Sequence, residues 1–140
     1  MVSVVPFRRI RISTRLSVEE TSTRLSQSVS KQTLFLALGK RGFQGRVTAH
    51  GFAIHRIVPY INSFLPWAYG EFKQEHDKCV IDATLMWHPS LMIVLPLLVL
   101  PFVLSGNGGI LLPGYILAMV DYNREAHTLF RFLLTTANLP

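Results

Sequence analysis

The sequence predicts an α+β fold: a small antiparallel sheet with an N-terminal helix, a membrane-embedded helical hairpin and a C-terminal amphipathic helix. Three observations support this prediction. Apolar and polar residues alternate with period two in several short segments before residue 88, as in half-buried strands. A helix-start signal begins at Ser17. Finally, no Asp, Glu, Lys or Arg occurs between Asp82 and Asp121.

The N-terminal segment is expected to form a strand followed by a helix. In residues 7–15, isoleucines alternate with arginines, which indicates a strand with one apolar face. The Arg-, Ser- and Thr-rich composition is also typical of an organelle transit peptide, but the alternation favours the strand. Ser17 and Glu20 form a capping box, which predicts a helix that runs to about Val29.

The remaining strands of the head are marked by short apolar runs between turn residues. Pro66 interrupts its segment and confines that position to a sheet edge or a bulge, because proline has no N–H to donate to a neighbouring strand. The expected strands are Leu34–Leu38, Phe43–Thr48, Phe52–Val58, Phe64–Phe72 and Val80–Trp87.

The uncharged run divides the chain into a head (1–88), a helical hairpin (89–120) and a C-terminal helix (121–140). We expect residues 89–104 to enter a membrane and residues 110–120 to return from it, after a turn rich in glycine. Both arms are shorter than the roughly 18–20 apolar residues of a full helical span, so a re-entrant hairpin is an alternative. A buried helix pair in a soluble core is another.

The C-terminal helix is predicted to be amphipathic and to lie over the sheet or along the membrane surface. Its apolar residues repeat every three or four positions from Tyr122 to Ala137, while Arg124 takes another face. Trp87, Tyr122 and Arg124 flank the uncharged run. They are the candidate membrane-interface residues, because aromatic rings and long cationic side chains favour that depth.

The charge distribution predicts both location and partners. The chain has 140 residues and a formal net charge of +6, and twelve of its fourteen Lys and Arg precede residue 79. Because a hairpin returns both flanks to one side, the positive-inside rule places the head on the cytoplasmic side of an inner or thylakoid-type membrane. Membrane lipids are the expected partners of the basic head. No nucleic acid is expected, since no segment gathers the arginines into a binding face.

Few side chains have the spacing that metal binding or catalysis requires. The single Cys79 excludes an internal disulfide, and with His76 it supplies only two of the three or four ligands that zinc needs. His50 and His55 flank a short turn, but two histidines do not define a metal site. No serine lies in a nucleophile elbow. We therefore predict no metal site and no catalytic residue.

His88 is the candidate cofactor-binding residue. It lies at the boundary between head and hairpin, where an imidazole nitrogen could ligate haem or chlorophyll. The interpretation we favour is an ordinary amphipathic boundary residue, so no cofactor is predicted and haem or chlorophyll is the alternative.

Together these features favour a non-catalytic accessory or assembly subunit of a larger membrane complex, for example a photosynthetic or respiratory one. Gly114 and Ala118 are candidate partner contacts, because small side chains let another helix approach closely. One alternative is a lipid- or pigment-binding module that encloses an apolar ligand near His88. A second is a membrane-bound enzyme acting on lipid headgroups, with a cluster of His55, Arg56, Ser63 and Asp82.

The sequence contains the short motifs Val18-Glu19-Glu20, Phe43–Val47, Phe52–Ile57, Asn62–Pro66, Gly70–Phe72 and Glu125-Ala126. These motifs resemble those of a group of small uncharacterised bacterial membrane proteins, cyanobacterial ones among them. The resemblance extends over residues 18–134 and implies a strand-rich head and two adjacent apolar segments, but no activity. The proline-rich first arm and His88-Pro89 depart from the pattern of the group.

Overall fold

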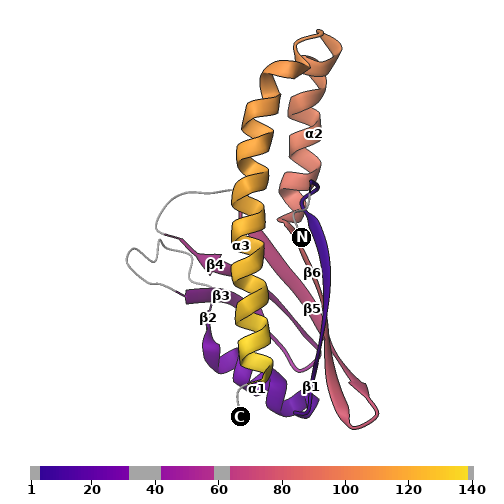
Figure 1. Ribbon diagram of the computed structural model, residues 1–140, viewed down its shortest axis with the longest axis vertical. Helices are drawn as coiled ribbons and strands as arrows, with labels where there is room; N and C mark the ends of the chain where they lie inside the picture. Colours follow the sequence, from indigo (N-terminus) through magenta and orange to yellow (C-terminus); the bar gives the residue numbers. More distant parts are fainter. Residues whose placement is uncertain (1–3, 32–41, 59–63, 139–140) are drawn as a thin grey trace.

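A computed structural model describes residues 4–31, 42–58 and 64–138 (Figure 1). In chain order the elements are β1 (Phe7–Thr14), α1 (Val18–Ser28), β2 (Val29–Lys31), β3 (Gly42–Val47), β4 (Gly51–Ile57), β5 (Pro66–Glu75), β6 (Lys78–Trp87), α2 (Pro89–Leu104), the 3₁₀ helix η1 (Gly108–Leu111) and α3 (Leu112–Asn138). The predicted strand at 34–38 lies outside the described residues.

The six strands form one mixed sheet in the order β1-β6-β5-β4-β3-β2. All neighbours are antiparallel except β2 and β3, which are parallel. The prediction of a purely antiparallel sheet is therefore wrong at this edge. Its cause is the length of β2, since three residues carry no alternation that could reveal a pairing.

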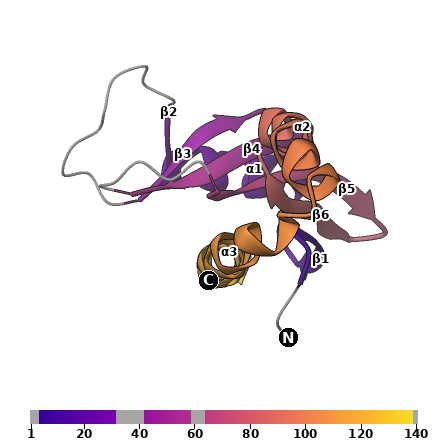
Figure 2. The ribbon, with the colours of Figure 1, turned by 90° about the horizontal axis from the view of Figure 1, so that it is seen from above.

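One face of the sheet is covered by α1 and α3 (Figure 1). Alternate side chains of β6 point to this covered face and join Leu25 of α1 and Leu129 of α3 in the main hydrophobic cluster. In Figure 2, which looks along the long axis, α2 and α3 are both seen nearly end-on. We call the opposite side the open face, and its side chains include Arg9, Gln44, His55, Trp67, Tyr69 and Asp82.

The start of the chain agrees with the sequence patterns. The strand expected at 7–15 is β1, and the predicted capping box is confirmed. The Ser17 hydroxyl accepts the backbone N–H of Glu20 at 3.1 Å, while the Glu20 carboxylate accepts the backbone N–H of Ser17 at 2.9 Å. Together these bonds satisfy two N–H groups that the first turn of a helix leaves without partners.

The return arm and the C-terminal helix form one helix rather than two. α3 has 27 residues and continues through position 120 without a break. Pro113 lies in its first turn, where proline is tolerated, and no further proline occurs before the helix ends at Asn138. From Ala118 onward the helix is amphipathic and buries nine residues against the sheet and α1. The part expected to leave the membrane is therefore joined rigidly to the part that covers the sheet.

The predicted membrane hairpin is wrong. Among the described residues, no helix is both long enough and apolar enough to cross a membrane. α2 ends after 16 residues at Leu104, and the apolar part of α3 is interrupted by Asp121, Arg124 and Glu125. The integral-membrane location, the cytoplasmic side assigned to the head and the role as a subunit of a membrane complex depended on that hairpin and are corrected with it.

Candidate functional site: an apolar arm with a cleft at its base

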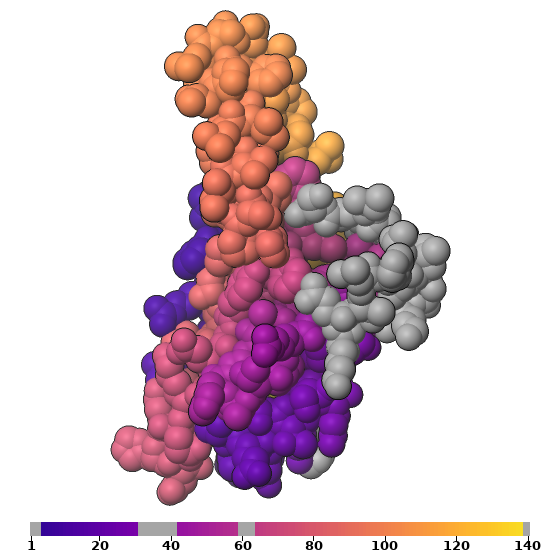
Figure 3. Space-filling model, turned by 180° about the vertical axis from the view of Figure 1, so that it is seen from behind, coloured from indigo at the N-terminus to yellow at the C-terminus, as the bar shows by residue number. Residues whose placement is uncertain are grey.

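An apolar arm, defined as residues 89–117, projects from the head along the long axis of the molecule (Figures 1 and 3). It comprises α2, η1 and the first six residues of α3. No residue of α2 is buried, and fourteen of the nineteen exposed large hydrophobic side chains in the described ranges belong to the arm. Leu97 is 65% exposed and Leu104 is 77% exposed. So large an apolar surface marks an interaction site.

Apolar side chains surround α2 on almost every side. Leu91, Leu95 and Val99 recur every four residues and are half-buried, so they form the least exposed stripe of the helix. All other residues from Met92 to Leu104 are exposed. A single flat partner surface can therefore cover only part of this helix, which resembles a buried helix more than a surface one.

The tip of the arm satisfies its own polar groups. The backbone N–H groups of Ser105, Gly106 and Asn107 donate to carbonyls of the last turns of α2, at 2.9 to 3.1 Å. The Asn107 amide donates to the carbonyl and hydroxyl oxygens of Ser105. Gly106 has a φ of +76°, which favours glycine at this turn. Because these donors are already paired, moving the tip into an apolar environment leaves few of them unsatisfied.

A cleft of about 440 Å³, the base cleft, lies where α2 leaves the open face of the sheet. Leu91 and Val94 of α2 line it together with Trp67 of β5 and His55 of β4. His55 and Trp67 are paired across the two strands, with ring centroids 4.2 Å apart. The His88 ring lies 5.2 Å from Trp67, edge to face. Three rings therefore meet beside an aliphatic wall.

The hydrogen bonds of His55 define its tautomer. Nδ1 lies 3.0 Å from the carbonyl oxygen of Arg56, which can only accept, so Nδ1 carries the hydrogen. Nε2 then accepts from the side-chain amide of Gln44 at 3.1 Å. Burial lowers the pKa of His55, against the opposing effect of the bond to Arg56. His55 is thus a neutral residue of the cleft lining with both nitrogens engaged.

His88, the candidate cofactor-binding residue, has a different arrangement. Its Nδ1 caps α2 by accepting the backbone N–H of Ser90 at 3.3 Å, and it lies 2.7 Å from the Ser90 hydroxyl. The hydrogen of the neutral ring is therefore on Nε2. No hydrogen bond within the described ranges uses that atom. His88, which lines the base cleft, therefore has one N–H that no described residue engages.

Of the three candidate interface residues, two are buried in the head. Trp87 is 2% exposed and Tyr122 is 0% exposed, and both belong to the cluster between the sheet and α3. The Tyr122 hydroxyl donates to the Leu85 carbonyl at 2.8 Å, and burial raises the pKa of Tyr122 to about 12. Arg124 is exposed. Alternation along β6 and the helical period of α3 turn both rings inward, away from any interface.

The two candidate partner contacts differ in accessibility. A Cβ atom added to Gly114 would meet nothing within 4 Å, so this position is open to a neighbour. Ala118, in contrast, is 9% exposed and packs in the core of its own chain. Only Gly114 therefore remains available to another molecule.

The residues expected to form a catalytic cluster do not gather in one cleft. His55 lies on the open face, whereas Arg56, the next residue, points to the covered face. There Arg56 Nη1 donates to both carboxylate oxygens of Glu125, at 2.9 and 2.8 Å. Ser63 lies outside the described residues. Because neighbouring residues of a strand point to opposite faces, His55 and Arg56 do not share a cleft, and the cluster expected of an enzyme acting on lipid headgroups is not formed.

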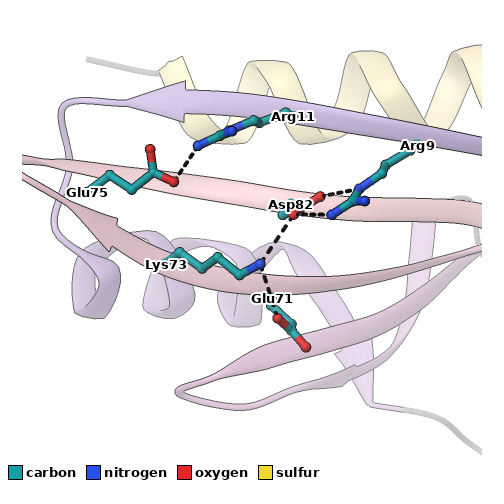
Figure 4. A network of polar contacts seen from close by, with 6 residues as sticks. All are labelled: Arg9, Arg11, Glu71, Lys73, Glu75 and Asp82. Carbon is teal, nitrogen blue, oxygen red and sulfur yellow. Dashed lines mark hydrogen bonds and ion pairs between the residues drawn. The ribbon is translucent and has the colours of Figure 1, made fainter.

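Asp82, the fourth member of that cluster, belongs to a surface network of ion pairs (Figure 4). Its carboxylate accepts hydrogen bonds from Arg9 at 2.8 and 3.1 Å and from Lys73 at 3.2 Å. These bonds hold the pKa of Asp82 well below its usual range. On the same face Arg11 pairs with Glu75. Asp82 is therefore ionised and fully engaged, unlike a general base.

An aromatic row on the open face was not foreseen from the sequence. Trp67 and Tyr69 stack with centroids 5.9 Å apart, and His55 extends the row across β4. The period-two spacing of Trp67 and Tyr69 is a signal that they share a face. The contribution of His55 depends on strand register, which no local pattern gives. The cations beside Tyr69 are paired with Asp82, so they do not form a free basic surface.

The sequence-level metal candidates also lie apart. Cys79 is fully buried, and burial raises the pKa of its thiol, while His76 is exposed in the turn before β6. Across the ranges 4–31, 42–58 and 64–138, no three His, Cys, Asp or Glu side chains are placed to hold one metal ion.

Comparisons with known proteins supply no further guide to the site. The resemblance to bacterial membrane proteins stays a prediction, because no match was found against which to test it. Neither a family model, nor a curated protein, nor a solved structure matches this chain.

Proposed function

We propose that this chain is a non-catalytic protein that docks peripherally on a lipid surface through its apolar arm, without spanning the bilayer. The observation that supports this is an arm with fourteen exposed large apolar side chains and no charged residue. The arm need not cross the bilayer. At about 1.5 Å per residue α2 is about 24 Å long, whereas the hydrocarbon core is about 30 Å thick.

The distribution of the apolar side chains favours lipid over a protein partner. A second copy of the chain, or a groove in another protein, covers one side of a helix and leaves the others in water. Lipid can contact a docked helix on several sides, and α2 exposes apolar side chains on every side except along its half-buried stripe. The tip of the arm also favours lipid as the partner. Its N–H groups already donate to oxygens within the tip, and unpaired N–H groups are costly in an apolar environment.

The free energy available is sufficient for docking. Complete burial of a Leu or Ile side chain contributes about 1.5–3 kcal/mol, so a half-exposed one contributes about 1 kcal/mol. If half of the fourteen side chains leave water, the gain is on the order of 7 kcal/mol. A single myristoyl chain, with a binding constant of about 10⁴ M⁻¹, corresponds to about 5.5 kcal/mol. The arm therefore equals or exceeds one acyl anchor.

Net charge supplies a second contribution. The arm is uncharged, but the whole chain carries +6. A basic residue near an anionic lipid surface contributes about 1 kcal/mol. We therefore expect binding to neutral vesicles and stronger binding to anionic ones, with only the second part weakened by salt.

Vesicle flotation tests the proposal. The wild-type chain is expected to float with phosphatidylcholine vesicles and more strongly when phosphatidylglycerol is added. Leu97→Asp with Leu104→Asp should lower binding by more than tenfold, because each charge costs about 2.5 kcal/mol or more in hydrocarbon. Gln27→Asp, an exposed position of α1, is the matched control and should float like the wild type.

Two results contradict the proposal. One is equal flotation of all three proteins, or of none. The other is that the wild type is a dimer in lipid-free solution, whereas the Leu97→Asp, Leu104→Asp variant is a monomer that floats like the wild type. In that case the arm binds a second copy of the chain and not lipid. A fluorophore on Leu104→Cys reports depth directly, since Cys79 is fully buried and should not be labelled. Its emission should shift to the blue when vesicles are added.

A further inference from the structure

The base cleft combines apolar walls with a hydrogen-bond donor, and docking of the arm on a lipid surface does not require either feature. Its volume of about 440 Å³ falls within the range of about 300–1,000 Å³ that small-molecule sites occupy. Leu91, Val94 and Trp67 give it apolar contacts. His88 adds a single N–H donor at Nε2, and His55 cannot add another because Gln44 and the Arg56 carbonyl engage its nitrogens.

We propose that the base cleft binds an amphiphile in which a single acyl chain is joined to an oxyanion. The oxyanion accepts a hydrogen bond from His88 Nε2, and the acyl chain lies against Leu91 and Val94. This inference rests on the proposed lipid docking for the source of the ligand, since the cleft lies where the arm joins the head.

The lining favours an oxyanion as the polar part of the ligand. No Asp or Glu is among the residues that line the cleft, so no lining carboxylate repels an anion. Burial lowers the pKa of His55, the other imidazole of the lining. His88 is the exposed one, and a hydrogen bond from its Nε2–H to an oxyanion is charge-assisted.

The geometry of α2 favours an acyl chain as the apolar part. Val94 and Leu98 are four residues apart and therefore neighbours on one face of the helix, and Leu98 is 63% exposed. The apolar wall of the cleft thus continues outward along the arm. An acyl chain longer than the cleft can follow this track, whereas a compact polar ligand would leave it uncovered.

Two sources share this chemistry: the phosphodiester and one chain of a bilayer lipid, or a free single-chain amphiphile. The first test uses decyl phosphate below its critical micelle concentration, titrated by calorimetry into the full chain. Val94→Trp fills the cleft and should weaken binding at least tenfold. Ile93→Trp adds the same ring to the same helix outside the cleft lining and should leave binding unchanged. Equal affinities for the two variants, or no binding to the wild type, overturn the proposal.

A second variant tests the oxyanion contact. His88→Ser retains a good N-cap for α2 but removes the imidazole and its Nε2–H donor, which the short serine side chain cannot replace at that distance from the backbone. The wild type should bind decyl phosphate at least tenfold more tightly than decanol, and His88→Ser should abolish that preference. If the preference is unchanged in His88→Ser, the assigned contact is wrong.

Vesicles then identify the source. If Val94→Trp weakens flotation with phosphatidylglycerol vesicles and Ile93→Trp does not, the cleft holds a bilayer lipid; if only the decyl phosphate titration responds, it holds a free amphiphile. Both outcomes support the site.

The Leu97→Asp, Leu104→Asp variant distinguishes ligand binding in the cleft from docking on vesicles. It should bind decyl phosphate like the wild type but should not float with vesicles. If it loses decyl phosphate binding as well as flotation, the ligand binds to the arm itself and the proposed cleft site is wrong.

Discussion

At the scale of single residues, the ion pair of Arg56 and Glu125 is the charged contact on which the core depends. Glu125 is 1% exposed, and both its oxygens accept from one Arg56 nitrogen. Glu125→Gln leaves Arg56 without a counter-ion, but Arg56 is partly exposed and can reach water. We expect the free energy of unfolding to fall by about 2–3 kcal/mol, less than for a fully buried pair.

Urea unfolding followed by circular dichroism measures this loss. Glu75→Gln is the matched control, because Glu75 pairs with Arg11 at the surface of the open face and should lose much less. A Glu125→Gln midpoint as high as that of Glu75→Gln would show that the buried pair does not stabilise the fold.

At the scale of elements, the pairing of β3 with β4 depends on Gly45. Its φ is +150°, and a Cβ atom there would lie 2.1 Å from the Ala53 carbonyl oxygen. Gly45→Ala therefore has to separate the two strands as well as adopt an unfavourable backbone conformation. We expect a loss of more than about 2 kcal/mol in the free energy of unfolding. Gly42→Ala separates the two causes, since Gly42 has a φ of +143° but nothing within 4 Å. Equal losses in the two variants would mean that the contact with Ala53 is unimportant.

At the scale of the whole molecule, Tyr122 couples stability to alkaline pH. Its folded pKa of about 12 exceeds the value near 10 of an unfolded chain, so the folded protein holds the phenol proton more tightly. This contribution is complete below pH 10 and is lost as the pH rises from about 10 to about 12. Between these values stability should fall by up to about 1.4 kcal/mol per pH unit from this group. In Tyr122→Phe the slope should be flatter, as urea unfolding at pH 9, 10 and 11 would measure; an unchanged slope would assign the effect elsewhere.

Local patterns in this sequence predicted local structure well. The capping box at Ser17, the alternation in β1 and β6 and the apolar stripe of α3 all depend on neighbouring residues, and all are observed. The pairing of β1 with β6 joins segments about seventy residues apart and has no local signature. For the same reason the sequence singled out His88 but not Trp67 and Val94, which complete the base cleft only after the sheet and α2 are in place.

The uncharged run led to the largest error because hydropathy alone does not set helix length. The run extends from residue 83 to residue 120, but Gly106 and its neighbours divide it, and α2 closes after 16 residues. The apolar residues are real and exposed, yet neither helix meets the length and composition of a span. The same side chains therefore form an exposed apolar arm. Their exposure and the paired polar groups of the tip indicate what surrounds the arm.

The continuity of α3 has a mechanical consequence. Its 27 residues form a rod about 40 Å long, and Tyr122, Ala126 and Leu129 hold the part after residue 117 against the sheet. The first six residues belong to the arm, so one unbroken helix joins the arm to the head. The surface that binds the arm therefore also sets the orientation of the sheet. It thereby sets the direction in which Trp67 and Tyr69 of the open face point. A force that turns the tip of the arm is transmitted along α3 to the Glu125 ion pair. The helix therefore acts as a rigid connection between arm and sheet, not as a flexible linker.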